Sequence, residues 1–424
     1  MAALLIRGGR VIDPSCRRDG RFDLLIERGV IVAVEPSIPA NGAAVLEASG
    51  QVVAPGLIDV HAHLRQPGRE DEETIETGCL AAARGGFTTI CAMPNTEPAI
   101  DHRGVAEFVQ QEAARLGVIG VRPIGAITKQ RQGRELTDFG ELFDAGCVAL
   151  SDDGSPVADS WLMRRALEYA KTFNRPLMQH AEDPALAAGG VMHEGVVSTT
   201  LGLRGIPGEA ESIMIARDLA LAELTGGWIH FAHLSSAASV EMIRHAKRRG
   251  VHVTCEAAPH HLALTHEAVG DFDTAAKVNP PLRTERDRLA LIEGVRDGTI
   301  DCIATDHAPH TEWEKDADFD AAPCGISGLE TALAVCLTAL VAPGLLTFSQ
   351  LIERMATAPA SIIGVKGGTL QVKAEANVTL IDPSATWTVD PRQFLSKGRR
   401  SPFAGHAVTG RVTRVLYRGV EVGA

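Results

Sequence analysis

Between residues 56 and 340 the chain alternates short apolar runs with longer stretches in which apolar residues recur at helical spacing. An apolar run bounded by turn residues predicts a buried strand, and an apolar residue every three or four positions predicts a helix. The predicted strands are residues 57–64, 88–94, 119–126, 147–152, 175–180, 228–234, 251–256 and 301–306. The predicted helices are residues 73–84, 103–116, 139–145, 159–173, 211–224, 238–248, 285–295 and 328–340. Eight such units in succession predict an α/β fold, a parallel (β/α)8 TIM barrel.

Both ends of the chain lack this helical pattern and contain strand-like runs separated by turns. These runs are residues 3–6, 22–27, 30–34, 45–47 and 51–54 at one end, and residues 376–382 and 412–422 at the other, with a hairpin at Tyr417-Arg418-Gly419-Val420. Closely spaced strands without helices predict an antiparallel sheet. We expect both ends to form one small β-sandwich domain from residues 1–54 and 367–424, beside a barrel of residues 55–366.

Composition narrows the class of protein. The chain has 424 residues, 45% of them hydrophobic, which is enough for a large core. A net charge of −12 and the lack of a long basic run argue against a nucleic-acid partner. The N-terminus lacks a signal-peptide pattern, and the longest apolar run, residues 331–346, is too short and too broken to span a bilayer. Eight cysteines without a Cys-x-x-Cys pair indicate reduced thiols and predict a cytoplasmic protein.

The first predicted barrel strand ends in two histidines, His61 and His63. Residues two apart on a strand project to the same side, and only the small Ala62 lies between them. Two imidazoles so placed can hold one metal ion through their ring nitrogens. Two structural histidines would give the same pattern, so the pair by itself leaves both interpretations open.

Other predicted strands also end in residues that can bind a metal. Asp152 and Asp153 end the fourth strand, His180 the fifth, His233 the sixth and Asp306 the eighth. Because a TIM barrel carries its active site at the carboxyl ends of its strands, these side chains should meet at one rim if the barrel closes. Together with the first pair they can build one or two divalent metal sites.

The stretches that contain these residues resemble known families. The ligand pattern of the histidines and Asp306 is similar to that of the amidohydrolase superfamily. Four stretches resemble, more narrowly, dihydroorotases of the bacterial long-chain (class I) type: HAHLRQPG at 61–68, MPNT at 93–96, KVNPPLR at 277–283 and ATDHAPH at 304–310. The resemblance implies reversible cyclisation of N-carbamoyl-L-aspartate to (S)-dihydroorotate and water in de novo pyrimidine (UMP) biosynthesis. It also implies one or two Zn2+ ions per subunit.

The resemblance assigns a role to each candidate ligand. It implies that the metal ligands are His61, His63, Asp153, His180, His233 and Asp306. It further implies that Asp306 is the catalytic proton shuttle, although Asp306 could be a ligand only. Alignment on Asp153-Gly154-Ser155 selects Asp153, whereas Asp152 should face the other side of an extended segment and have a structural role. No lysine lies near residues 148–154 to act as the carboxylated bridging ligand of hydantoinases.

The same resemblance implies which residues bind the substrate. They are His63, Arg65, Asn95, Asn279, His310 and the backbone of Cys324-Gly325. Arg65 suits an anionic substrate because its planar fork can clamp a carboxylate. Asn279 could instead be a turn residue before Pro280-Pro281. This chain has Cys324-Gly325 where relatives have Phe-Gly, so the side-chain packing there should differ.

Three further expectations concern the surroundings of the site. His230 should face away from His233 by strand alternation. The pair His260-His261, which follows the seventh strand, should support the site from behind. The charged loop at residues 312–318 could be a lid over the site or a solvated loop.

Two other functions stay open at this point. Another cyclic amidase, such as a hydantoinase or allantoinase, would share the histidine ligands, but the missing strand-four lysine and the presence of Arg65 argue against it. A non-catalytic dihydroorotase-like partner of aspartate carbamoyltransferase would have lost metal ligands, and all six candidates are present here. Besides the small-molecule substrate, we expect a homodimer and no membrane partner, and we leave an aspartate carbamoyltransferase partner open.

Overall fold

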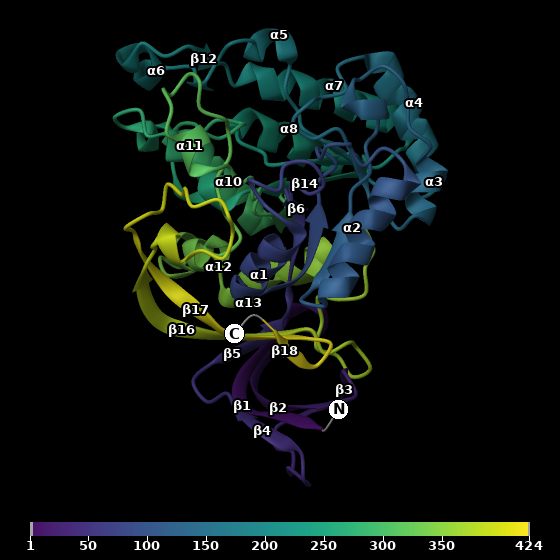
Figure 1. Cartoon of the computed structure of the whole chain (residues 1–424), viewed down its shortest axis with the longest axis vertical. Coiled ribbons are helices and arrows are strands. Elements are labelled where there is room, and N and C mark those ends of the chain that lie inside the picture. Colours follow the sequence, from purple (N-terminus) through teal and green to yellow (C-terminus); the bar gives the residue numbers. More distant parts are fainter. Residues whose placement is uncertain (1–2, 423–424) are drawn as a thin grey trace.

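The computed structural model describes residues 3–422 and contains the predicted barrel (Figure 1). Its eight strands pair in parallel in the orders β6-β7-β8 and β9-β10-β13-β14-β15. They are β6 (Leu57–Ala62), β7 (Phe87–Ala92), β8 (Gly120–Pro123), β9 (Leu150–Ser151), β10 (Leu177–Gln179), β13 (Ile229–Phe231), β14 (Val253–Ala257) and β15 (Cys302–Ile303). All eight predicted strands are confirmed, although most are shorter than expected.

Two parallel bridges close the barrel between these strand groups. Gly125 pairs with Leu150, which joins β8 to β9, and Ala62 pairs with His307, which joins β6 to the segment after β15. A buried carboxylate strengthens the second joint, since Asp59 Oδ1 accepts a hydrogen bond of 3.0 Å from the Thr305 backbone N–H. The first and last strands therefore meet directly beside the histidine pair.

The predicted helices surround the strands. They are α1 (Ile75–Arg84), α2 (Arg103–Leu116), α3 (Phe139–Asp144), α4 (Ser160–Lys171), α7 (Glu209–Thr225), α8 (Ala237–Arg248), α10 (Glu285–Asp297) and α12 (Ala332–Cys336), the last extended by a π-helical turn at Leu337–Val341. Local signals fix several ends: Asp159 caps α4, and a left-handed Gly117 ends α2. Apolar helix faces pack on strand residues such as Phe87 and Phe231 in the main core.

Several short elements were not predicted, because they are too short to show a period. Those within the barrel are α5 (Pro184–Ala187), β11 (Met192–His193), α6 (Val196–Leu201), β12 (Gly205–Ile206), α9 (Pro259–Ala263) and α11 (Glu312–Lys315). Beyond it follow α13 (Phe348–Ile352), a π-helical segment (Glu353–Thr357) and α14 (Ala358–Ile363). Ile362 and Ile363 of α14 join a second cluster with Ile58, Val60 and Met178, which fills the barrel interior.

The two chain ends share one eight-stranded sheet, which forms the β domain at the bottom of Figure 1. Its strands are β1 (Leu4–Asp13), β2 (Arg18–Glu27), β3 (Val30–Glu35), β4 (Ala44–Glu47), β5 (Val52–Pro55), β16 (Val378–Thr388), β17 (Ala407–Tyr417) and β18 (Val420–Val422). Antiparallel pairing of β5 with β16 joins the ends. The predicted hairpin is confirmed, because Tyr417 pairs with Val420 across Arg418 (φ 51°) and Gly419 (φ 77°).

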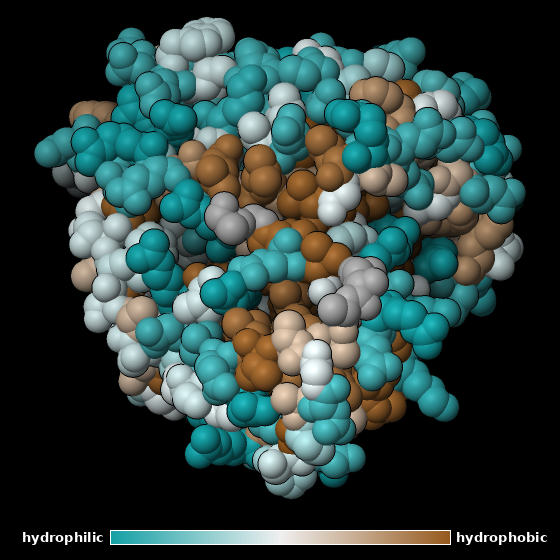
Figure 2. Space-filling model, turned by 60° about the horizontal axis from the view of Figure 1, so that its bottom comes forward, coloured by the Kyte–Doolittle hydropathy of each residue, from teal (hydrophilic) through white to brown (hydrophobic). Residues whose placement is uncertain are grey.

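The strands of the β domain form one continuous sheet around a shared core rather than two unconnected sheets. Residues from both chain ends, such as Leu24, Val53, Leu380 and Leu416, lie in this core. Figure 2 views the molecule with this end brought forward and shows apolar surface gathered near the middle of the face, with polar surface around it. Among residues 3–422, no helix is both long and apolar enough to cross a membrane.

A buried carboxylate just before α12 ties the C-terminal segment to the barrel. Glu330 accepts hydrogen bonds of 3.0 Å from the Leu395 N–H and 3.3 Å from the Ser396 N–H, and Arg84 lies 3.7 Å away. Burial raises the pKa of Glu330 from 4.5 to about 7. The folded state therefore binds the proton more tightly than the unfolded state. The stability that this proton contributes is complete below pH 4.5 and is lost as the pH rises through 7.

We predict that Glu330→Gln, which is neutral at every pH, becomes more stable relative to the wild type as the pH rises from 5 to 8. The expected change in the free-energy difference is on the order of 2 kcal/mol. Urea unfolding of both proteins at the two pH values measures it. Glu223→Gln makes the same chemical change at an exposed carboxylate paired with Arg249 and is the matched control. An equal free-energy difference at pH 5 and pH 8 for Glu330→Gln would contradict the assignment.

Candidate functional site

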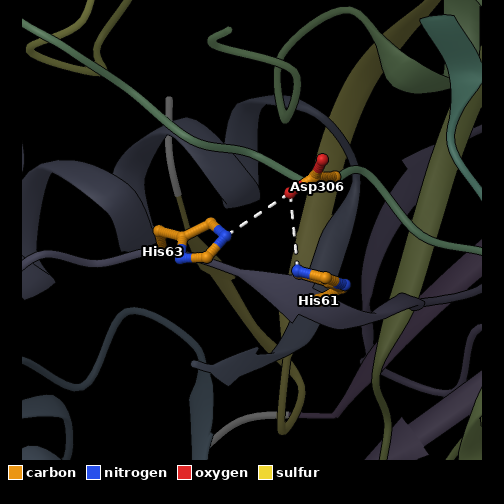
Figure 3. Close-up of side chains that lie close together, drawn as sticks. All are labelled: His61, His63 and Asp306. Atoms are coloured by element: carbon orange, nitrogen blue, oxygen red, sulfur yellow. Dashed lines mark ion pairs between the residues drawn. The ribbon is translucent and has the colours of Figure 1, made fainter. Parts of the chain in front are cut away.

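The six predicted metal ligands converge at the carboxyl ends of the barrel strands. His61 lies in β6 and His63 follows it, and both rings point at Asp306, which follows β15 (Figure 3). Each Nε2 atom lies 3.4 Å from the same oxygen, Asp306 Oδ1. All three side chains are buried. The backbone therefore places the imidazoles of His61 and His63 next to the Asp306 carboxylate.

Asp153 lies at the centre of the group, because each of the four histidines has a ring nitrogen within 3.9 Å of its carboxylate. The distances are 3.4 Å to His61 Nε2, 3.5 Å to His63 Nε2, 3.7 Å to His233 Nε2 and 3.9 Å to His180 Nδ1. The rings of His180 and His233 also meet, with Nδ1 of the first 2.9 Å from Nε2 of the second. A carboxylate in this position can reach toward His61 and His63 as well as toward His180 and His233.

The donor atoms fit a divalent metal. His61 Nε2 and Asp153 Oδ1 are buried and have no hydrogen-bond partner in the protein, a state that is costly for polar atoms. Two overlapping triads, His61 with His63 and Asp306, and His61 with Asp153 and His233, hold their ligand atoms within 4.8 Å of one another. Imidazole nitrogens and carboxylate oxygens are the donors that zinc takes in catalytic sites.

Left-handed backbone turns aim several of these side chains. His233 has φ 30° and Asp306 has φ 48°, conformations that non-glycine residues adopt rarely and mostly at functional sites. The turns also break strand alternation, so the prediction that His230 faces away from His233 was wrong. The His230 ring lies 3.1 Å from Glu256 Oε2, and Oε1 of the same carboxylate lies 2.6 Å from His61 Nδ1. Both histidines of this strand therefore point into the barrel.

Charges within the site hold the carboxylates ionised. Burial favours the neutral form of Asp153, but His61 and His233 outweigh it and lower its pKa well below the ordinary value. The pKa of Asp306 is lowered in the same way. Burial alone would lower the pKa of His61, whereas Asp153, Glu256 and Asp306 together raise it well above the ordinary value. The site therefore presents negative charge that a cation can neutralise.

The two predicted asparagines touch the metal-site histidines. Asn95 Oδ1 lies 2.8 Å from His63 Nδ1, and Asn279 Nδ2 lies 3.5 Å from His180 Nε2. Asn279 also donates a hydrogen bond of 3.2 Å to Glu182. Both asparagines thus lie beside metal-site histidines, and their contact with a substrate stays a prediction.

Arg65 and His310 share one buried carboxylate, Glu72. Arg65 Nε lies 3.0 Å from Glu72 Oε2, and His310 Nδ1 lies 2.7 Å from Glu72 Oε1. Arg65 Nε also donates to the Pro309 carbonyl at 3.3 Å. Glu72 therefore holds the arginine and the histidine next to each other.

The Cys324-Gly325 backbone is already hydrogen-bonded within the protein. The Cys324 carbonyl accepts from His310 Nε2 at 2.9 Å, and the Gly325 N–H donates to the Lys277 carbonyl at 2.9 Å. With φ 138°, Gly325 has no room for a Cβ, which would lie 2.5 Å from the Ala308 carbonyl oxygen. The predicted substrate contact here would need another atom of this loop or a rearrangement.

A buried lysine, Lys315, anchors the loop that follows His310. Lys315 Nζ donates to the carbonyls of Thr274 (2.9 Å), Lys277 (3.3 Å) and Pro323 (2.9 Å). Lys315 alone is buried within residues 312–318, whereas residues 316–318 are exposed, so a lid and a solvated loop both stay predictions.

Sequence reasoning missed three carboxylates that support the site, Glu72, Glu182 and Glu256. Glu256 offered a signal, because it is a charged residue inside a predicted buried strand. The expectations for Asp152 and His261 agree with the structure: Asp152 Oδ1 accepts the N–H groups of Ile127 (2.8 Å) and Thr128 (3.0 Å), away from the metal-site histidines. His261 Nε2 donates to the Pro280 carbonyl at 2.9 Å, beside Asn279.

Comparison with known proteins decides the family. The chain is 53% identical to the dihydroorotase of Pelotomaculum thermopropionicum over 407 residues, which are 96% of this chain and 95% of that protein. It is 50% identical to the dihydroorotase of Acetivibrio thermocellus over 98% of each chain. The chain belongs to the dihydroorotase family. A family model described as dihydro-orotase-like matches residues 50–239 of this family member.

Solved structures confirm the barrel with its β domain for this dihydroorotase family member. The structure superposes on the L-hydantoinase (dihydropyrimidinase) from Arthrobacter aurescens with a TM-score of 0.88 and 26% identity, covering 99% of this chain and 96% of that one. The dihydropyrimidinase from Brevibacillus agri NCHU1002 gives a TM-score of 0.85 at 25% identity, covering 99% and 94%. These neighbours, like the family, are metal-dependent cyclic amidohydrolases.

Asp153 and Asp152 provide a matched pair for testing the strand-four ligand. We predict that Asp153→Asn weakens zinc binding by on the order of a hundredfold, because it removes the carboxylate that all four histidines face. Asp152→Asn makes the same chemical change one residue away and should keep its zinc, with some loss of stability. Competition with a chelator measures both affinities. Equal losses, or a larger loss for Asp152→Asn, would refute the choice of Asp153.

Proposed function

We propose that this protein is a dihydroorotase that catalyses the reversible cyclisation of N-carbamoyl-L-aspartate to (S)-dihydroorotate and water in de novo pyrimidine (UMP) biosynthesis. The observation that supports this best is the position of Asp153, within 3.9 Å of four histidine rings. By the family resemblance, a carboxylated lysine takes this position in hydantoinases, and this chain has Asp153 there. About half of the residues match dihydroorotases over nearly the whole chain.

The proposed metal is zinc, one or two ions per subunit, held by the four histidines with Asp153 and Asp306. The unpartnered His61 Nε2 and Asp153 Oδ1 support this assignment. A divalent ion bound there supplies Lewis acidity toward a carbonyl oxygen and lowers the pKa of a bound water to about 7. The protein's part is to fix the donors, to exclude other water and to move the proton.

Asp306 is the proposed proton shuttle. Its carboxylate is ionised, buried and turned into the site by the left-handed backbone at φ 48°. In the hydrolytic direction it accepts a proton as water attacks the ring carbonyl, and it then gives that proton to the leaving amide nitrogen. In the cyclisation direction the same steps run in reverse.

The substrate carries carboxylate groups, and the proposed contacts are mostly donors. They are His63, Arg65, Asn95, Asn279, His310 and the Cys324-Gly325 backbone. Glu72 and the Pro309 carbonyl both engage Arg65 Nε, and Arg65 Nη2 lies 3.4 Å from His310 Nε2, which places the arginine and the histidine side by side for a substrate carboxylate. Glu72 would then keep the arginine fork in one orientation during binding.

A hydantoinase is the second candidate, because the structure superposes along nearly its whole length on an L-hydantoinase. The test is a steady-state comparison of the purified protein on dihydroorotate and on an uncharged hydantoin, with zinc content assayed in parallel. We predict that kcat/KM for dihydroorotate exceeds that for hydantoin by at least about a hundredfold, because only the first offers Arg65 a carboxylate. A preference for the hydantoin would overturn the proposal. Zinc-loaded protein without activity on either would favour the non-catalytic alternative.

The homodimer and a carbamoyltransferase partner stay predictions. The apolar surface in Figure 2 would suit a protein contact. Exposed apolar side chains of the β domain include Val32, Val45, Val372 and Val420. Analytical ultracentrifugation of the protein, alone and with an aspartate carbamoyltransferase, would test both. The proposed cytoplasmic location agrees with eight free cysteines.

Arg65 offers a test of how the carboxylate is recognised. We predict that Arg65→Lys lowers kcat/KM for dihydroorotate by on the order of tenfold to a hundredfold, since lysine cannot reproduce the paired geometry of a charge-assisted bond. Zinc content should stay unchanged. Arg69→Lys is the control, because Arg69 also bonds Glu72 (2.8 Å) but reaches outward to Glu314. Equal losses for both variants would mean that Arg65 only supports the structure.

A further inference from the structure

A chain of polar side chains crosses the barrel interior beneath the histidine pair. Trp228 Nε1–H donates to Thr254 Oγ1 at 2.9 Å, and Thr254 Oγ1 lies 2.9 Å from His230 Nδ1. His230 Nε2 lies 3.1 Å from Glu256 Oε2, and Glu256 Oε1 lies 2.6 Å from His61 Nδ1. The chain therefore runs from the start of β13, across β14, to the metal-facing end of β6.

The ionised Glu256 sets the direction of the two hydrogen bonds beside it. An indole N–H can only donate, so Thr254 Oγ1 accepts from Trp228, and the same hydroxyl contacts His230 Nδ1. His230 carries a proton on Nε2 and donates it to Glu256, which can only accept. The ionised Glu256 can only accept, so His61 must carry its proton on Nδ1. Nδ1 is therefore turned to Glu256, and His61 Nε2, the atom without a partner in the protein, is the nitrogen that faces Asp153 and Asp306.

The surroundings give Glu256 few other partners. Glu256, His230 and His61 are each 1% exposed or less, and the interior around them is apolar, with Val60, Met178 and Ala304 in its cluster. The remaining donor to Glu256 is the His233 backbone N–H at 3.3 Å. A buried carboxylate without donors is very costly, so the two imidazoles and this carboxylate hold one another in place.

We propose that Glu256 is a positioning residue for the metal centre, and that the chain from Trp228 to Glu256 fixes the tautomer and orientation of His61. A ligating histidine whose other ring nitrogen donates to a carboxylate is oriented and made more basic, and loss of such a partner typically weakens metal binding 10–100-fold. This inference rests on the proposed metal site but not on the identity of the substrate.

The test measures zinc binding to metal-free protein together with the ring protonation of its histidines. Glu256→Gln keeps the shape of the side chain but removes its charge, and we expect zinc affinity to fall about 10–100-fold in chelator competition. In the 15N spectrum of histidine-labelled apoprotein, the wild-type His61 signal, identified by its absence in His61→Gln, should show a protonated Nδ1. This signal should change in Glu256→Gln.

Two further variants separate positioning from general stability. Glu330→Gln removes another buried carboxylate, which contacts the Leu395 and Ser396 backbone and no metal-site histidine; its zinc affinity should equal that of the wild type. Thr254→Val leaves Glu256 in place but removes the hydroxyl that directs His230, so zinc affinity should fall several-fold.

Three outcomes have distinct meanings. Wild-type zinc affinity together with an unchanged His61 signal in Glu256→Gln would overturn the inference. If Glu256→Gln does not fold, Thr254→Val decides, and an affinity equal to that of the wild type would overturn it. A wild-type protein that binds no zinc would instead contradict the proposed metal centre itself, and with it the proposed function.

Discussion

The structure depends on keeping one group of buried charges together. The Asp153 carboxylate lies within 3.9 Å of ring nitrogens from four histidines, and all of these side chains are buried. Charges interact strongly in a poorly solvated interior but are expensive to bury alone. Each charge is therefore compensated by the others. Because they come from different strands, closing the barrel and assembling the site are the same event.

Barrel closure rests on a second set of buried polar contacts beside the first. Asp59 accepts the N–H of Thr305, and the His63 N–H donates to the His307 carbonyl at 2.8 Å. These bonds join the first strand to the segment after the last, at the point where the histidine pair meets Asp306. A change that loosens this joint would move the ligands apart, so stability and chemistry are coupled here.

Carboxylates behind the site hold its reactive groups in one orientation. Glu256 contacts His61 on the metal side, and Glu72 contacts Arg65 and His310 on the side where the substrate should bind. Rigid support of this kind lowers the cost of organising donors when a ligand arrives. It also explains why so many ionisable groups lie buried in the barrel of this chain.

The amino-acid sequence by itself determined the order of strands and helices, because periodicity is local and repeats in eight units. The approximate strand ends also follow from it, although most strands end earlier than predicted, and residues such as His61, His180 and Asp306 could therefore be chosen as candidates. What only the tertiary structure decided are relations between distant segments: Glu256 behind His61, Glu72 between Arg65 and His310, and Lys315 under its loop. The sequence pattern also failed at His230, because the left-handed turn at His233 breaks the alternation that the prediction assumed. Periodicity reports which face a residue takes within one element, whereas hydrogen-bond partners depend on which elements the closed barrel brings together.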